Sequence, residues 1–300
     1  MMERPRLRGP TGFVPPSART AMPNRRCAIV ALALSLTAAA AEAQAEIAVS
    51  VGFNSQYQWR GLTTTNRGVV QPDLAVSFPS GQGSLTFGAW ANLEGGRYDD
   101  VRRHISESGG QRPGLAEYDL RIEGARHFGR VGITIGASTY SYPNRLGTTG
   151  ASNTAEAYAR VALDAPLAPS VALWQDVQKV RGAYAEFGVT QEIGPIALAA
   201  IGGWNLGQSL GDGGALGYFA RHGLTHVDMS ASAEWSVGTV SMAPAVHVLF
   251  GSDPNTFVAS PNASRGAKLW FGTSIGWSGR AASRVQRIAE ATEEEAQEKR

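Results

Sequence analysis

The sequence has 300 residues with 27 basic and 25 acidic side chains, and this near balance gives no indication of a polyanionic partner such as nucleic acid. Charged residues make up only 17% of the chain, against about 25% in soluble domains. After residue 45 no apolar run reaches about 18 residues, which excludes a helical membrane protein and leaves a β-barrel as the way to span a bilayer. The single cysteine, Cys27, excludes a disulfide framework and a cysteine metal site.

The first 45 residues predict a cleaved signal peptide. Arg25 and Arg26 precede an apolar run over 27–41, and small residues typical of a cleavage site follow. We expect translation to start at Met22, because the preceding residues would extend an already complete signal. Removal of residues 1–45 takes away six basic and two acidic residues and leaves 21 basic and 23 acidic ones. The basic excess therefore belongs to the leader.

From residue 46 onward, apolar and polar residues alternate with a period of two, as in strands with one apolar and one polar face. Tyr118, Leu120 and Ile122, for example, alternate with Asp119 and Arg121. The alternation predicts twelve strands, over residues 46–59, 68–78, 84–94, 117–128, 130–142, 154–164, 169–179, 182–193, 195–206, 225–236, 238–250 and 267–278.

The connections between these strands alternate in length. Short turns near residues 79–83, 129–130, 165–168, 194–195 and 238 alternate with long loops over 60–67, 95–116, 143–153, 207–224 and 251–266. The short link near Val180 is the exception. The pattern is typical of an all-β, antiparallel, up-and-down transmembrane barrel with short periplasmic turns and longer extracellular loops. The barrel is expected over 46–278 with both termini in the periplasm, followed by a polar, charged tail over 279–300.

Aromatic residues on the predicted apolar face gather at the two strand ends, as in the aromatic girdles of membrane barrels. The long-loop end carries Tyr57, Trp59, Tyr118, Trp204 and Phe250, and the short-turn end carries Phe78, Phe128, Trp235 and Trp277. A soluble sandwich or a lipocalin-like barrel would also alternate, with these residues in its core, but neither explains the alternating loop lengths.

If the apolar face meets lipid, the polar face lines a lumen. The predicted pore-lining residues are Arg60, Asp73, Asp119, Arg121, Glu123, Glu156, Arg160, Asp176, Glu186, Asp228 and Glu234. Acidic positions outnumber basic ones on this face, so an open pore would favour cations. The alternative is that these charges pair across strands and close the interior, which the inward Trp90, Tyr158, Trp174 and Tyr184 would narrow further.

The last predicted strand carries Gly272, Ile275 and Trp277 at the spacing of the signal that outer-membrane barrels present to their insertion machinery. Here the chain continues beyond the aromatic residue, so the signal would be internal.

The residue pattern gives little support to the hypothesis that the protein is an enzyme. The five histidines form no His-Glu-x-x-His pair, and His222 with His226 in a glycine-rich loop is a weak metal motif. Asp119 and Glu123 could be read as a carboxylate pair, but an acidic wall always offers such pairs. We therefore expect no catalytic residues, metal or cofactor. A third possibility is an adhesin or binding barrel that contacts ligands through the loops over 97–112 and 207–222.

The stretch Ser55–Thr63, which reads Ser-Gln-Tyr-Gln-Trp-Arg-Gly-Leu-Thr, and the following Gln71–Leu74 resemble the opening of the TorF-like putative porins. Tyr140–Pro143 and Glu156–Tyr158 add to the resemblance, which extends over about residues 47–277. Gln56 departs from the aspartate common in that family. The resemblance implies an outer-membrane barrel more firmly than any substrate.

The sequence thus predicts an exported bacterial outer-membrane porin through which ions or small solutes diffuse passively, with mild cation selectivity. Its expected partners are outer-membrane lipid, the barrel-insertion machinery and the solutes themselves. A closed barrel that acts as an adhesin or ligand-binding protein is the alternative, and a barrel enzyme ranks below both.

Overall fold

The computed structural model describes residues 45–95, 114–143, 153–209, 217–253 and 267–280. Every regular element within these ranges is a β-strand, and no helix there is long and apolar enough to cross a membrane. The predicted leader, the charged tail and much of the four longest loops lie outside the described residues.

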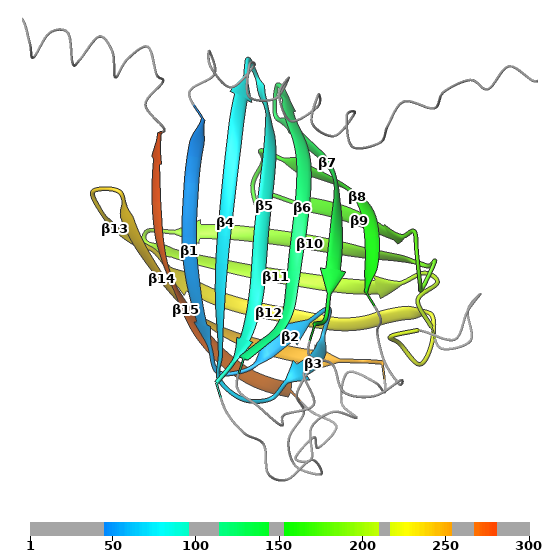
Figure 1. Ribbon diagram of the computed structural model, residues 1–300. Coiled ribbons are helices and arrows are strands. Elements are labelled where there is room, and N and C mark those ends of the chain that lie inside the picture. The colour runs from blue at the N-terminus through cyan, green and yellow to red at the C-terminus, as the bar shows by residue number, and fades with distance from the viewer. Residues whose placement is uncertain (1–44, 96–113, 144–152, 210–216, 254–266, 281–300) are drawn as a thin grey trace, which may run out of the picture. The chain divides into compact units, whose positions relative to one another are not determined.

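Twelve long strands form the wall of the molecule (Figure 1). They are β1 (Glu46–Asn54), β4 (Val69–Ser80), β5 (Gly83–Glu94), β6 (Gly114–Phe128), β7 (Val131–Ser141), β8 (Thr154–Leu163), β9 (Ser170–Asp176), β10 (Ala183–Ile193), β11 (Ile196–Asn205), β12 (Gly223–Ala233) with its continuation β13 (Trp235–Val237), β14 (Val240–Gly251) and β15 (Ala267–Arg280).

The sheet is antiparallel throughout and closes on itself. Each wall strand pairs with its neighbours along the chain, and β1 pairs with both β4 and β15. Strands β12 and β13 pair with successive parts of β14, so together they count as one strand of the wall. The predicted twelve-stranded, antiparallel, up-and-down barrel is therefore confirmed. Among the described wall strands, closure gives each one except the short β13 a partner on both sides, as a barrel in lipid requires.

The two faces of the wall differ sharply in polarity. Large apolar side chains point away from the barrel and are exposed, with 64% of Ile135, 68% of Leu269 and 64% of Phe271 accessible. The residues next to these in each strand, such as Thr134 beside Ile135 and Trp270 beside Leu269, face the interior of the barrel together with the polar side chains. The arrangement inverts that of a soluble barrel, in which apolar residues fill the interior.

The short turns lie at the end where β1 begins and β15 finishes, because Glu46 pairs with Ser77 near the β4–β5 turn and with Arg280. Tight turns there use residues with positive φ, such as Gly129 (60°) and Gly238 (63°). The opposite end carries the longer connections.

The segment after β1 departs from the prediction. A single strand over 46–59 was expected, with Tyr57 and Trp59 in the outward girdle, but β1 ends at Asn54. The chain then forms a separate hairpin of β2 (Tyr57–Trp59) and β3 (Leu62–Thr65) before it rejoins the wall at Val69. The predicted girdle positions of Tyr57 and Trp59 are wrong, because both rings contact side chains of the inner face.

Candidate functional site: a hairpin latched inside the barrel

The β2–β3 hairpin consists of two short strands joined by a two-residue turn. It lies at the end of the barrel opposite the start of β1 (Figure 1). Trp59 pairs with Leu62, and the two residues between them have positive φ, 49° for Arg60 and 81° for Gly61. Positive φ at both central positions is the geometry of a type I′ turn, whose twist matches that of a tight hairpin. Arg60 adopts it despite the strain that a left-handed backbone imposes on a residue with a side chain.

Arg60 projects from the hairpin tip to the wall strand β8. Its two terminal nitrogens donate hydrogen bonds to the two carboxylate oxygens of Glu156, at 2.8 Å and 2.6 Å. The Arg60 side chain is 5% exposed and that of Glu156 is 1% exposed. A fork-to-fork pair of this kind adds directional specificity to the charge attraction.

Three aromatic rings surround the Arg60 guanidinium. Its central carbon lies 4.4 Å from the ring centroid of Trp59, 4.5 Å from that of Tyr184 and 5.1 Å from that of Trp174. Cation–π attraction at such distances strengthens when water is excluded. Burial by itself lowers the pKa of Arg60, but the charge and hydrogen bonds of Glu156 outweigh it and raise that pKa above its ordinary value. Arg60 therefore stays charged inside the barrel.

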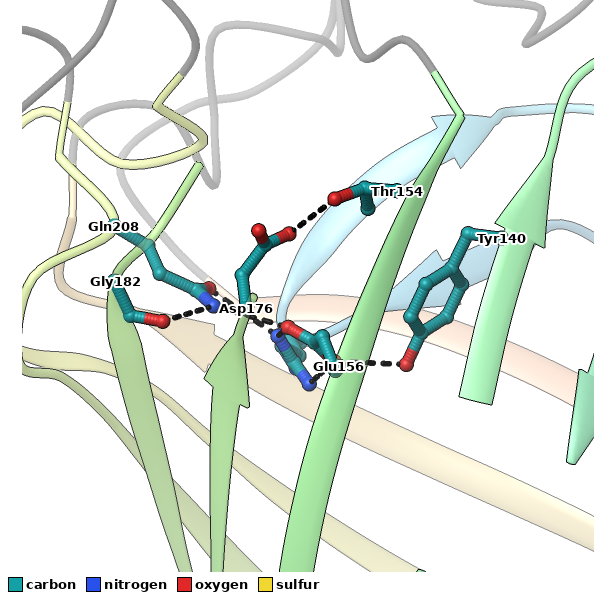
Figure 2. Close-up of polar contacts among 7 residues, drawn as sticks. Tyr140, Thr154, Glu156, Asp176, Gly182 and Gln208 are labelled. Atoms are coloured by element: carbon teal, nitrogen blue, oxygen red, sulfur yellow. Dashed lines mark hydrogen bonds and ion pairs between the residues drawn. The ribbon is translucent and has the colours of Figure 1, made fainter. Parts of the chain in front are cut away.

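Glu156 is held by wall residues as well as by the hairpin (Figure 2). The Tyr140 hydroxyl donates to Oε2 of Glu156 at 2.8 Å, and Nε2 of Gln208 donates to Oε1 at 3.0 Å. The same Gln208 amide reaches the Gly182 carbonyl at 3.2 Å, and its backbone N–H donates to Oδ1 of Asn205 at 2.7 Å. The carboxylate is thus fixed by several contacts that do not involve β2 or β3.

Asp176 lies beside this cluster and accepts hydrogen bonds from the short connection between β9 and β10. Its Oδ2 accepts a hydrogen bond from the Thr154 hydroxyl at 2.6 Å, as Figure 2 also shows. Its Oδ1 accepts backbone N–H groups from all four residues of 178–181, at 2.9–3.1 Å. With 1% of its surface exposed, Asp176 is committed to the loop. The prediction that it lines an open pore is wrong for this reason.

Further contacts join the hairpin to strands around the barrel. The Thr65 hydroxyl donates to Glu94 of β5 at 2.6 Å, and the ammonium of Lys268 on β15 donates to the Thr63 hydroxyl at 2.8 Å. The Tyr57 ring lies 5.4 Å from that of Trp90 on β5. Because β8, β9 and β10 hold Arg60, the hairpin is anchored on widely separated parts of the wall and crosses the lumen between them.

The hairpin tip also fits closely against β12. A Cβ atom on Gly61 would lie 2.6 Å from Cγ of His226, which is closer than carbon atoms approach. The His226 side chain is buried, with Nδ1 3.1 Å from the Thr225 hydroxyl and 3.5 Å from that of Tyr184. Glycine at position 61 is therefore required by both its φ and its surroundings.

The Trp59 ring closes the other side of the tip. It lies 6.3 Å from the Tyr140 ring and 4.8 Å from the Tyr218 ring, both in edge-on orientations. Tyr218 belongs to the connection between β11 and β12, where burial raises the pKa of its hydroxyl and keeps it neutral. Phe219 beside it is fully buried and stacks on Tyr184 at 5.5 Å. This connection thus packs against the hairpin.

A second polar group lies along the inner face of β4, β6 and β8. Arg121 donates to both carboxylate oxygens of Asp73, at 2.6 Å and 2.8 Å, and lies 3.7 Å from Glu123. The Tyr158 hydroxyl donates to Glu123 at 2.8 Å. These side chains are about a quarter to a third exposed, so water screens them more than it screens Arg60.

A third group lies on β12, β14 and β15. Nδ1 of His247 lies 3.0 Å from Oδ2 of Asp228, and the imidazole stacks on Trp270 with 3.6 Å between ring centroids. The other Asp228 oxygen and the Trp270 indole nitrogen have no hydrogen-bond partner in the described part of the chain. The same ranges hold no cluster of three or more His, Cys, Asp or Glu side chains that could bind a metal ion.

The inner face toward the short-turn end carries many small residues among larger ones such as His127 and Glu192. By the register of the strand pairs, the small residues share the inner face with the polar groups above. They are Ala48, Ala75, Gly132, Ala162, Gly188, Ala197, Ala199 and Ala245. The side chains therefore leave more room at this end than at the hairpin.

Six of the predicted pore-lining residues lie close to one another in the structure. Arg60 pairs with Glu156, and Arg121 contacts Asp73 and Glu123. Asp176 binds Thr154 next to Glu156. Asp228 pairs instead with His247. Arg160 and Glu186 occupy the same inner row, either side of Ala172, and make no hydrogen bond or ion pair with another described residue. Glu234 falls at the interruption between β12 and β13 and is exposed, beside a cavity of about 290 Å³ that Asp73 also lines.

Sequence reasoning missed the role of Gln208, which it placed in a free loop, and the inward course of the segment over 60–67, which it took for an outer loop. The Arg60–Gly61 dipeptide was a weak signal for the hairpin, because glycine is common at the second position of such a turn.

No protein-family model matches the chain, and no curated protein sequence matches it. Similar solved structures include an outer-membrane channel from Pseudomonas putida F1, with 9% identity, a TM-score of 0.46, and coverage of 89% of this chain and 100% of that one. The KdgM porin shows 10% identity and a TM-score of 0.41 over 77% of this chain and 98% of its own. Outer membrane phospholipase A from Escherichia coli shows 11% identity and a TM-score of 0.38, over 77% and 95%. This likeness assigns no activity.

Proposed function

We propose that the protein is a bacterial outer-membrane channel through which ions or small solutes diffuse passively, and that the β2–β3 hairpin is its constriction and gate. The observation that carries the proposal is a closed barrel with an apolar exterior and a polar interior, crossed by a hairpin whose tip the Arg60–Glu156 ion pair helps to hold.

The exterior supports a place in a membrane. Exposed large apolar side chains occur on all the wall strands except β5, and such an extensive surface would be unfavourable in water. A closed β-barrel is one of the two structures that can satisfy all backbone groups in lipid. The predicted signal peptide and the insertion signal at Gly272, Ile275 and Trp277 are consistent with outer-membrane lipid and the insertion machinery as partners.

The interior supports passage rather than catalysis. Many small residues line the end with short turns, while polar and aromatic side chains line the end with the hairpin. The proposal includes no covalent step and no cofactor, because diffusion needs only a polar path. The closed-barrel alternative gains support from the hairpin, since a permanently latched hairpin would leave a barrel suited to ligand binding through its loops.

Mild cation selectivity follows from the charges that remain outside the ion pairs. Glu123 is engaged by Arg121 and Tyr158, whereas Glu186 makes no hydrogen bond or ion pair with another described residue and Glu192 is exposed on the same inner face. Glu186 and Glu192, with Arg160 as the opposing base, are expected to set the sign of the fixed charge along the path.

The test is single-channel recording in planar bilayers with refolded protein of residues 46–300. Discrete current steps, with reversal potentials that indicate cation preference, are expected. A Glu186→Gln, Glu192→Gln double variant should lose most of that preference. Anion selectivity of the unmodified protein would contradict the charge argument, and a folded, inserted protein without current would favour the closed binding barrel.

A further inference from the structure

The wall around Arg60 has the chemistry of a receptor for a guanidinium group. Glu156 offers both carboxylate oxygens, Oε1 of Gln208 accepts a third hydrogen bond from Arg60 at 3.2 Å, and the rings of Trp174 and Tyr184 lie against the cation. All four residues belong to the wall or to its connections. In the described part of the chain, the Arg60 side chain of the hairpin occupies this position.

Contacts that do not involve the hairpin hold this receptor in place. Tyr140 and Gln208 hold Glu156, and Gln208 is in turn held by Asn205 and Gly182. Glu156 is 1% exposed while Arg60 covers it, and withdrawal of Arg60 would leave this carboxylate beside the aromatic rings without its cation. A buried charge that loses its partner is strongly unfavourable, so the empty site would favour a replacement cation.

Arg60 reaches this site from a strained backbone. Its φ of 49° places a residue with a side chain in the left-handed region, and the Gly61 that follows is also left-handed. A free guanidinium group would make the same two hydrogen bonds to Glu156 without that strain. The planar geometry of the site matches guanidinium better than ammonium, because only a planar fork donates two parallel hydrogen bonds to one carboxylate.

We propose that Glu156, Gln208, Trp174 and Tyr184 form a binding site for the guanidinium group of a small cationic solute, which replaces Arg60 and holds the hairpin out of the lumen. The binding site follows from the contacts alone. The displacement of the hairpin as a means of opening the channel rests on the proposed function.

Binding is tested with refolded Arg60→Ala protein titrated with guanidinium chloride in the millimolar range, at constant ionic strength maintained with sodium chloride. Tryptophan fluorescence reports on the site because Trp59 and Trp174 flank it. Urea, which is planar but neutral, is the matched ligand control. A saturable change with guanidinium and none with urea is expected. The unmodified protein should show at least about tenfold weaker apparent affinity, because its tethered arginine competes.

The matched variant is the Arg60→Ala, Glu156→Gln double substitution, which removes the carboxylate as well as the arginine. It should not bind guanidinium. The site is overturned if folded Arg60→Ala protein, identified by its heat-dependent shift in electrophoresis, shows no saturable change. Equal binding by the double variant overturns it as well.

Arg60→Ala could fail to fold because Glu156 loses its partner. In that case folding that is restored by guanidinium and not by urea or sodium chloride supports the site. Arg60→Gln, which keeps a neutral hydrogen-bond donor, is then titrated in the same way, and absence of binding to folded Arg60→Gln overturns the site.

The displacement step is tested by recording currents of the unmodified protein with guanidinium or agmatine added. More frequent or larger steps are expected, with no such effect in Glu156→Gln. Binding to Arg60→Ala without any effect on these currents overturns displacement. Failure of the proposed function gives a different result, in which guanidinium binds to Arg60→Ala but no variant conducts.

Discussion

Arg60 and Glu156 are 96 positions apart in the sequence and meet inside the barrel through two hydrogen bonds of 2.8 Å and 2.6 Å. The pair joins the connection after the first strand to the wall at β8. Through it the tip of the hairpin is fixed to the wall, while Thr63 and Thr65 hold the second strand of the hairpin to Lys268 and Glu94. In the proposed gate, the buried charge pair is the contact that a competing cation would replace.

Substitution of Glu156 by glutamine should lower the free energy of unfolding by about 3–5 kcal/mol, because Arg60 would remain buried without a counter-charge. Urea titration of protein inserted in lipid vesicles measures this difference. Glu192→Gln, an exposed site on the inner face of β10, is the matched control and should change the free energy by less than about 0.5 kcal/mol. Equal effects of the two substitutions would show that the pair does not stabilise the protein.

Gly61→Ala should release the hairpin, whereas Gly81→Ala in a short turn should not. Both glycines have positive φ, so either alanine incurs left-handed backbone strain of about 1–2 kcal/mol. Only the alanine at position 61 meets a neighbour, since Cγ of His226 would lie 2.6 Å from its Cβ and nothing lies within 4 Å of a Cβ at position 81.

Limited trypsin digestion with mass spectrometry measures this release, because Arg60 is buried in the latched hairpin and a free hairpin exposes the bond after it. Faster cleavage after Arg60 is expected for Gly61→Ala alone. Similar cleavage rates in both variants would argue that the fit against His226 does not hold the hairpin.

The lipid-facing assignment of the outer wall is tested on adjacent residues of β10. Val189 points outward and is 39% exposed, and Thr190 faces the lumen in the row of Ala199 and Ser230. Val189→Arg should destabilise the inserted barrel by about 2–4 kcal/mol, the cost of a cation near the bilayer midplane, and Thr190→Arg by much less. Urea unfolding in vesicles distinguishes them, and the reverse order would mean that the faces are exchanged.

The wall was predictable because its signal is local. Alternation with a period of two identifies each strand and its inner face, so Asp73, Arg121 and Glu123 were placed on the same side although 48 residues separate Asp73 from Arg121. That prediction needed only the strand parity. The barrel then brings these side chains together through its closure and register.

The hairpin was not predictable for the same reason. Alternation continues through residues 55–59 because the hairpin is itself extended, and a period of two does not say to which sheet a strand belongs. From the local pattern, Trp59 is predicted to face lipid, and only its contacts with Tyr140 and Tyr218 show that it faces inward. From the local pattern, Asp176 is predicted to line the pore, whereas in the structure it accepts hydrogen bonds from four backbone N–H groups. In each case the deciding contacts are with residues that the local pattern does not identify.

The most direct test of a hairpin-gated channel is the single-channel conductance of a hairpin-deleted barrel. Residues 55–68 are replaced by an Asn-Gly turn, which joins Asn54 to Val69, two residues that already pair across β1 and β4. The account predicts larger and steadier current steps than those of the unmodified protein, with the barrel still folded. Unchanged conductance, or a folded and inserted deletion variant that carries no current, would contradict it.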